Sequence, residues 1–387
     1  MANNNCKSSY PLSIFVVFVT LFTLMSSVTM VMAAQPTISP QDDNKNMNYE
    51  EMLSIVKAAS SPSPKWDGPL SGPAGKHDQC IAIICEDLKN GGIIHVAQGV
   101  QEAASVMKWK VKVYDAEGTP KGRKTAFKKA LASDPNGIAL IGADANTVST
   151  ELQQAYTQKI PVVGWHVGPV AGYLHEGPIV MNISTDPKEV AKITAMAAIT
   201  SSKNKSGVVI FTDSNFAIAM EKANIMADII RSCSDCELLE VKDVAISNSA
   251  ETVPEVVQTL LTKYGDKWTC GLAINDIYFD YAVPALILED SKSDALHFLS
   301  AGDGSNAAFL RIQTGTFQTH TVAEPLKMQG WQMVDELNRL MSGEDVTGYI
   351  APPHLVTTEN ALSDGGAQFL FDPDNGYKDT YKKIWKR

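Results

Sequence analysis

The residues best suited to chemistry in this sequence are carboxylates, amides and aromatic rings that follow short apolar runs. Asp87 and Asn90 follow "CIAIIC", and Trp165 and His166 follow "PVVG". The pattern recurs at Asn215 after "GVVIF", at Asn275 after "CGLAI", at Asp303 after "LHFLSAG", and at Glu324, which ends "FQTHTVAE". Carboxylates and amides bond hydroxyl groups, while aromatic rings cover C–H surfaces. The set predicts a site for a small polyhydroxylated ligand.

A structural role competes with ligand binding at part of this set. Asp213, Ser214 and Asp276 also follow apolar runs and precede helical patterns. Asp and Ser are favoured N-cap residues, so capping alone explains each of them. Trp165 and His166 make poor caps, and polar or aromatic clusters follow nearly every apolar run, which favours a binding site.

The elements that position these residues alternate between continuously apolar runs and amphipathic segments. Helices are expected at residues 92–108, 121–132, 146–159, 187–202, 216–230, 253–264, 278–290 and 305–313. Continuously apolar strands are typical of parallel sheets with helices on both faces. The pattern predicts an α/β fold with two doubly wound, parallel-sheet lobes, whose ligands bind beyond the carboxyl ends of the strands.

The amino-terminal residues indicate export. An apolar block at residues 11–32 precedes "VMAAQP", which predicts a cleavable signal peptide at residues 1–34 and a periplasmic protein; an uncleaved membrane anchor is the alternative. Residues 35–78 are rich in Pro, Ser and Gly and predict a linker, a tether or surface wrap with one short helix near residues 49–57.

Composition excludes several classes of function. The net charge of −10 argues against a nucleic-acid surface, and the basic run at residues 121–129 is interpreted as the solvated face of a helix. "CSDC" at residues 233–236 favours a local disulfide or two free thiols. No cysteine or histidine pairs have the spacing of a zinc site, and we expect neither metal nor cofactor.

Several motifs resemble the type I periplasmic binding proteins, in the ribose-binding group that serves ABC transporters. The likeness covers about residues 79–350. Its carriers are "NGGIIHVAQGVQEAA", "IPVVGWH", "AINDIYFDYAVPAL", "AGDGSNAA" and "TVAEPLKMQGWQMVDEL". The resemblance implies two lobes with the ligand clamped between them. Residues 79–181 and 324–352 would form the first lobe, and residues 182–323 and 353–387 the second.

The resemblance also implies three crossings, near Asn182, Ala323 and Pro352, about which the lobes close. Family ligand contacts fall on Asp87, Asn90, His166, Asn215, Phe216, Asn275, Asp303 and Glu324. Ribose-type members carry an aspartate-arginine pair where this chain has His166 and Val167, and place an arginine near Ile218 that this chain lacks. A site short of arginine, with Trp165, His166 and Tyr278, suits another polyol, a sugar derivative or a non-sugar.

These observations predict a monomeric, non-enzymatic protein that delivers a small polar ligand, a sugar or a derivative, to an ABC permease. A sensor for chemotaxis or quorum signalling would present the same surfaces and is the alternative. A secreted carbohydrate-active enzyme is a third hypothesis, because Asp303 and Glu324 could form a carboxylate pair. No nucleophile elbow, P-loop or HExxH motif supports it.

Overall fold

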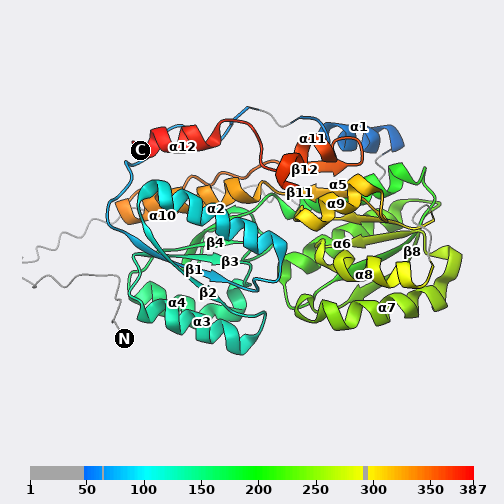
Figure 1. Ribbon diagram of the computed structural model, residues 1–387, viewed down its shortest axis with the longest axis horizontal. Helices are drawn as coiled ribbons and strands as arrows, with labels where there is room; N and C mark the ends of the chain where they lie inside the picture. The colour runs from blue at the N-terminus through cyan, green and yellow to red at the C-terminus, as the bar shows by residue number, and fades with distance from the viewer. Residues whose placement is uncertain (1–47, 63–64, 291–294) are drawn as a thin grey trace, which may run out of the picture.

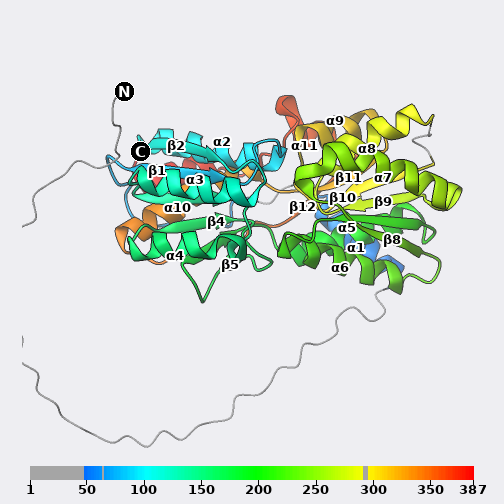
Figure 2. The same ribbon diagram turned by 90° about the horizontal axis from the view of Figure 1, so that it is seen from below.

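The protein has two lobes that lie side by side along its longest axis (Figures 1 and 2). The computed structural model describes residues 48–62, 65–290 and 295–387. The predicted signal peptide, residues 1–34, lies outside the described residues. Across the described ranges, no helix has the length and apolar character needed to cross a membrane.

The first lobe is built on a six-stranded sheet in the order β2-β1-β3-β4-β6-β5. Its strands are β1 (Cys80–Cys85), β2 (Lys110–Asp115), β3 (Gly137–Ile141), β4 (Val162–Trp165), β5 (Gly172–Tyr173) and β6 (Ile179–Ile183). Its helices are α2 (Gly91–Met107), α3 (Pro120–Ala132), α4 (Ser149–Thr157) and α10 (Leu326–Ser342), with a 3₁₀ turn η1 (Ala145–Val148). All neighbouring strands are parallel except β5 and β6, as the doubly wound prediction requires.

Strand β1 illustrates why the central strands are apolar throughout. Ile81 and Ile83 belong to the core shared with α2 and α10, whereas Ala82 and Ile84 belong to the core on the face of α3 and α4. Successive side chains of a strand point to opposite faces, so a strand covered on both faces needs apolar residues at every position. Figure 1 shows α2 and α10 on one side of this sheet and α3 and α4 on the other.

The second lobe repeats this arrangement with the strand order β12-β11-β10-β9-β7-β8. Its strands are β7 (Gly207–Thr212), β8 (Glu237–Asp243), β9 (Cys270–Ala273), β10 (His297–Ser300), β11 (Gln318–Ala323) and β12 (His354–Thr357), the last antiparallel to β11. Its helices are α5 (Pro187–Ser201), α6 (Ala217–Ser232), α7 (Ser249–Tyr264), α8 (Ile277–Leu288), α9 (Asn306–Thr314) and α11 (Ala361–Gly365); the 3₁₀ turns are η2 (Ile246–Asn248), η3 (Gly265–Lys267) and η4 (Gly366–Gln368).

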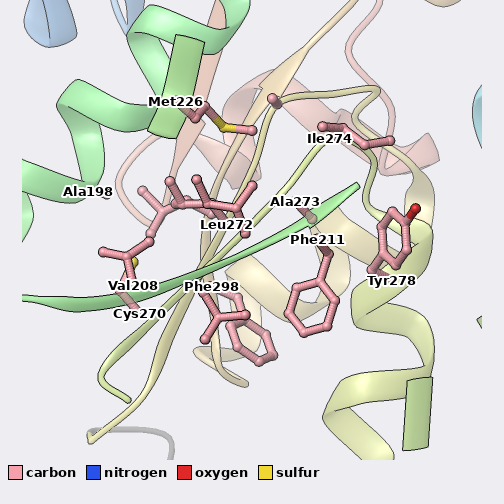
Figure 3. Close-up of a cluster of buried hydrophobic side chains, with 14 of the residues drawn as sticks. Ala198, Val208, Phe211, Met226, Cys270, Leu272, Ala273, Ile274, Tyr278 and Phe298 are labelled. Atoms are coloured by element: carbon pink, nitrogen blue, oxygen red, sulfur yellow. The ribbon is translucent and has the colours of Figure 1, made fainter. Parts of the chain in front are cut away.

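The core of the second lobe lies around the central strands β7 and β9 (Figure 3). Val208 and Leu272 come from these strands, and Phe298 from β10 stacks on Phe279 of α8 with ring centroids 4.4 Å apart. The motif "CSDC" follows α6 and contains a disulfide between Cys233 and Cys236, one of the two expected outcomes. Cys85 and Cys270 are buried free thiols.

The three expected crossings between the lobes are present. The chain passes from β6 to α5, from β11 to α10, and from Tyr349, which packs beside the first-lobe core, to β12. The first two crossings join the end of a strand in one lobe to the start of a helix in the other, and the third is a loop that leads from Tyr349 to the start of β12.

The terminal segments add two further connections between the lobes. Helix α1 (Tyr49–Ala59) packs on α5 of the second lobe, whereas Trp66 lies against Tyr349 and Tyr381 of the first, with ring centroids 5.3 Å away in each case. Within the described part of the predicted linker, residues 48–62 and 65–78, the chain therefore contacts both lobes. At the other end, α12 (Tyr377–Trp385) returns from α11 to the first lobe, where Trp385 stacks on Trp331. The structure places α12 with the first lobe, unlike the expected assignment of all of residues 353–387 to the second.

Candidate functional site

A cavity of about 200 Å³ lies between the lobes, beyond the carboxyl ends of their strands. The first lobe contributes Glu86, Asp87, Asn90, Arg123, Trp165 and His166, and the second contributes Asp213, Asn215, Phe216, Lys222, Asn275 and Asp303. Strands of both sheets end at this cavity because parallel strands present their carboxyl ends at one edge. Eight of the ten predicted site residues line it.

The lobes touch each other around the cavity. A Cβ atom added at Gly118 of the first lobe would lie 3.0 Å from the Cβ of Ser247 in the second, and one added at Gly92 would meet the carboxylate of Asp303. The backbone N–H of Ala217, at the start of α6, donates a 3.0 Å hydrogen bond to Asp144 Oδ2 of the first lobe. These contacts define a closed arrangement of the lobes.

An ion pair between Glu86 and Arg123 forms one wall of the cavity. The Arg123 Nε donates to both carboxylate oxygens of Glu86, at 2.8 and 3.0 Å, and both side chains are buried. Burial raises the pKa of Glu86, while the hydrogen bonds and charge of Arg123 oppose that rise. The Arg123 guanidinium also lies 6.0 Å from the ring centroid of Phe216 in the other lobe. A planar cation thus connects the two lobes at the cavity.

A second polar cluster lies where the lobes meet, and it contains His166, Asp303 and Glu324. His166 Nε2 is 2.9 Å from Glu324 Oε1, and Asn275 Nδ2 donates to Asp303 Oδ2 at 2.7 Å. Burial raises the pKa of Asp303 to about 6. Burial acts in the same direction on Glu324, but the charges of His166 and Lys222 and the hydrogen bond donated by Gln329 lower the pKa of Glu324 to about 2.

Trp165 fixes this cluster in place. Its indole N–H donates to Gln329 Oε1 at 2.8 Å, Gln329 Nε2 donates to Glu324 Oε2 at 2.8 Å, and the Trp165 ring stacks on His166 with centroids 3.7 Å apart. His166 adopts a left-handed backbone, with φ of 53°, a conformation that histidine adopts more often than most residues. The two rings that follow β4 therefore support each other, and one face of Trp165 is covered by His166.

The family of the chain follows from comparison with known proteins. A family model described as "Periplasmic binding protein domain" matches residues 81–345, which span both lobes. The chain belongs to this periplasmic binding protein family. The match covers the strands that end at the cavity and the first two crossings, from β6 to α5 and from β11 to α10. The resemblance inferred from the motifs is thereby confirmed at the level of the family and its two-lobed fold.

Individual relatives of this periplasmic binding protein are distant. A 5-methylthioribose transporter solute binding protein from Thermotoga lettingae has a TM-score of 0.67 at 15% identity, over 80% of this chain and 98% of the other. A carbohydrate transporter solute binding protein from Agrobacterium radiobacter, in complex with D-arabinose, has a TM-score of 0.65 at 19% identity, over 76% and 98%. "Catabolite control protein A" of Staphylococcus epidermidis is 22% identical over 43% of this chain. This chain spans less than half, 46%, of that relative.

Two predicted site residues do not line the cavity of this binding protein. Tyr278 is fully buried in the second lobe, where it lies beside Phe211 (Figure 3) and donates its hydroxyl proton to the Val244 carbonyl oxygen at 2.7 Å. Its predicted place in the site is wrong, because the first turn of α8 directs this ring into the core. Glu324 does not line the cavity either; its Oε1 lies 2.9 Å from Nε2 of His166, which does. Asp213 caps the turn after β7, since its carboxylate accepts from the backbone N–H of Asn215.

The sequence analysis missed two cations of the site, Arg123 and Lys222. Arg123 lies within the basic run interpreted as a solvated helix face, yet it is 8% exposed; Lys222 is 3% exposed and donates to the Ala301 carbonyl oxygen at 2.7 Å. A signal was present in both cases. Arg123 is spaced with Ala126, Phe127 and Ala130 on the buried stripe of α3, and Lys222 falls on the buried stripe of α6. A charged residue at a core position of an amphipathic helix is a candidate site residue.

Proposed function

We propose that this protein is a periplasmic solute-binding protein that captures a small polar ligand, a sugar or a sugar derivative, by closure of its lobes. The observation that carries this proposal is the polar cavity held between the closed lobes. Its volume of about 200 Å³ is below the ~300–1,000 Å³ typical of sites for drug-sized ligands. A ligand of one ring fits such a space better than an oligosaccharide does.

The chemistry of the lining supports a ligand rich in hydroxyl groups. Asp87 and Asp303 present carboxylates from opposite lobes, and Asn90 and Asn215 present amides. Because a hydroxyl both donates and accepts, it can bridge these groups, whereas an apolar ligand would leave them without partners. A ligand that touches both lobes favours the closed form, since those contacts exist only there.

Delivery to an ABC permease, a periplasmic location and a signal peptide at residues 1–34 belong to the same proposal. Membership of the periplasmic binding protein family supports the location, and the Thermotoga and Agrobacterium structures are of transporter solute binding proteins. The closed lobes would present a joint outer surface that a permease distinguishes from the open form.

The proposal is tested by a thermal-shift screen of pentoses, hexoses, polyols and their derivatives, followed by isothermal titration calorimetry. A ligand present at a hundredfold excess over its dissociation constant stabilises the protein by about 2.7 kcal/mol, which is readily measured. Asp87→Asn should weaken binding by about tenfold or more, because it removes a charged acceptor of ligand hydroxyls. Asp115→Asn is the matched control, since its carboxylate serves backbone N–H groups of its own lobe.

Two outcomes contradict the proposal. One is a screen in which no sugar or polyol raises the melting temperature. The other is a ligand whose affinity is the same for both variants. Recovery of the ligand unchanged after long incubation supports binding without catalysis, while its hydrolysis indicates the enzyme hypothesis.

A further inference from the structure

We propose that His166, Asp303 and Glu324 form a binding site for a divalent transition-metal ion at the junction of the two lobes. One ligand atom from each of the three residues can be chosen so that all three atoms lie within 4.8 Å of one another, and all three side chains are buried. The residues come from three separate segments, which explains why no metal-binding motif exists in the sequence. This site is independent of the identity of the organic ligand.

Two buried atoms of the cluster lack the partners that a buried polar atom requires. His166 Nε2 and Glu324 Oε1 have no hydrogen-bond partner within the described part of the chain. They lie 2.9 Å apart, but in a geometry outside that of a hydrogen bond. Buried polar atoms without partners are rare in folded proteins, and a bound cation would supply the missing partner of both. Because the two atoms lie 2.9 Å apart, one cation could contact both.

The spacing of these atoms fits a coordination sphere. Two ligands bound at about 2.1 Å and at right angles to each other are about 3.0 Å apart, close to the separation of His166 Nε2 and Glu324 Oε1. Asp303 is within reach as the third ligand. One imidazole with two carboxylates favours metals such as Zn²⁺, Mn²⁺ or Fe²⁺ over Ca²⁺ or Mg²⁺. Three protein ligands leave coordination positions open for a ligand in the cavity.

Neighbouring groups hold both carboxylates by hydrogen bonds, as the residues around a metal site hold the ligands of the metal. Gln329 and the Thr185 N–H both donate to Glu324 Oε2, which leaves Oε1 for the cation. Asn275 donates to Asp303 Oδ2 in the same way, leaving Oδ1. These bonds orient both carboxylates before any ion arrives.

The local charge also favours a cation. The positive charge of Lys222 acts on both carboxylates, and Asp276 adds negative charge that acts on Asp303. Two carboxylates against one ammonium leave the cluster negative when His166 is neutral, which is the form that binds metals. Because His166 belongs to the first lobe and Asp303 to the second, a bound ion would hold the lobes closed.

The test uses the purified full-length protein after treatment with a chelator, and Zn²⁺ as the probe. Competition with a fluorescent chelator should detect one equivalent of bound Zn²⁺. Glu324→Gln and His166→Gln should each weaken this binding by about tenfold or more. His354→Gln is the matched control, because His354 is equally buried and lies 2.7 Å from the carboxylate of Asp364 outside the cluster. It should leave Zn²⁺ binding unchanged.

A second measurement on the unaltered protein keeps the test independent of how the variants fold. Co²⁺ bound to nitrogen and oxygen ligands gives visible absorption bands, which should appear with one equivalent and disappear on addition of Zn²⁺. Absence of stoichiometric Zn²⁺ and Co²⁺ binding overturns the proposal, as does equal affinity in the Glu324→Gln and His354→Gln variants.

The sugar screen run with and without chelator separates this inference from the proposed function. If a sugar binds but the protein binds no Zn²⁺, the proposed metal site is refuted and the proposed solute-binding function stands. Zn²⁺ binding that depends on Glu324, with no sugar or polyol bound under either condition, supports the metal site and removes the proposed function.

Discussion

Replacement of Asp144 by asparagine should open the lobes, because Asp144 closes them through a single cross-lobe hydrogen bond. Asp144 Oδ1 accepts from the Asn146 N–H within the first lobe, and Oδ2 accepts from the Ala217 N–H at the start of α6 in the second. Helix α6 has no side-chain cap of its own. Asp144 therefore caps a helix of the opposite lobe, with a negative charge at the positive end of the helix.

The size of the effect follows from this geometry. An asparagine has one acceptor oxygen, so it can serve only one of the two N–H groups and turns a donor towards the other. Loss of a hydrogen bond to a buried charged acceptor costs about 2 kcal/mol, and Asp144 is 4% exposed. In the open form water hydrates both groups, so the loss applies to the closed form alone. The closed-to-open ratio should fall by about 30-fold.

Two measurements together detect this shift. If the ligand-free protein is mainly open, the affinity for a sugar found in the screen falls by about 30-fold, because closure accompanies binding. If the ligand-free protein is mainly closed, its radius of gyration in small-angle X-ray scattering increases instead. Asp115→Asn makes the same chemical change without a partner in the other lobe and should alter neither quantity. An Asp144→Asn protein with unchanged affinity and unchanged scattering would refute the reasoning.

Three further predictions concern stability. Burial raises the pKa of Glu336 from 4.5 to about 7, so its stabilising contribution is complete below pH 4.5 and is lost as pH rises through 7. Glu336→Gln should remove this pH-dependent loss of stability, which amounts to up to about 3 kcal/mol in the free energy of unfolding. The melting temperature of the variant should therefore fall less between pH 4.5 and 7, and an unchanged pH profile contradicts the prediction. A Cβ at Gly330 would lie 2.5 Å from the backbone of α2. In urea unfolding, Gly330→Ala should therefore cost about 1–3 kcal/mol, despite the better helix propensity of alanine, while Gly168→Ala, which meets no atom within 4 Å, should be tolerated. Trp66→Ala should cost about 2 kcal/mol in urea unfolding through loss of its contact with Tyr381, and equal stability would show that the surface wrap is not anchored there.

Much of the fold was predictable because both lobes obey local rules. Residues 187–202 were predicted as a helix and the structure has α5 at Pro187–Ser201; residues 92–108 correspond to α2 at Gly91–Met107. A continuously apolar strand and its alternation with a helix can both be recognised within a short stretch of sequence. The position of α12 was not predictable in this way, since Trp385 is placed by stacking on Trp331, far earlier in the chain.

The site was predictable where the strand-end rule applies and not where helices reach into it. Asp87, His166, Asn275 and Asp303 follow strands and line the cavity. Tyr278 follows a strand as well, but it lies within the first turn of α8, and helical periodicity rather than strand position decides where such a residue points. The pairing of Glu86 with Arg123 depends on how α3 packs beside β1 within the first lobe. The cap given by Asp144 depends on how the two lobes approach each other, and no single segment encodes either contact.

The terminal segments restrict how the two lobes of this protein can move apart. A hinge of three crossings leaves two lobes free to separate, but here α1 is anchored on α5 while Trp66 is anchored on the first lobe, and α12 returns to that lobe from α11. Figure 1 shows both terminal segments on the side of α10, with α3 and α7 on the opposite side. Connections placed along one side restrict twisting and sliding while they still permit rotation about that side. The lobes should therefore open by rotation about the side of α10, and the cross-lobe contacts at Asp144 and Arg123 should separate together.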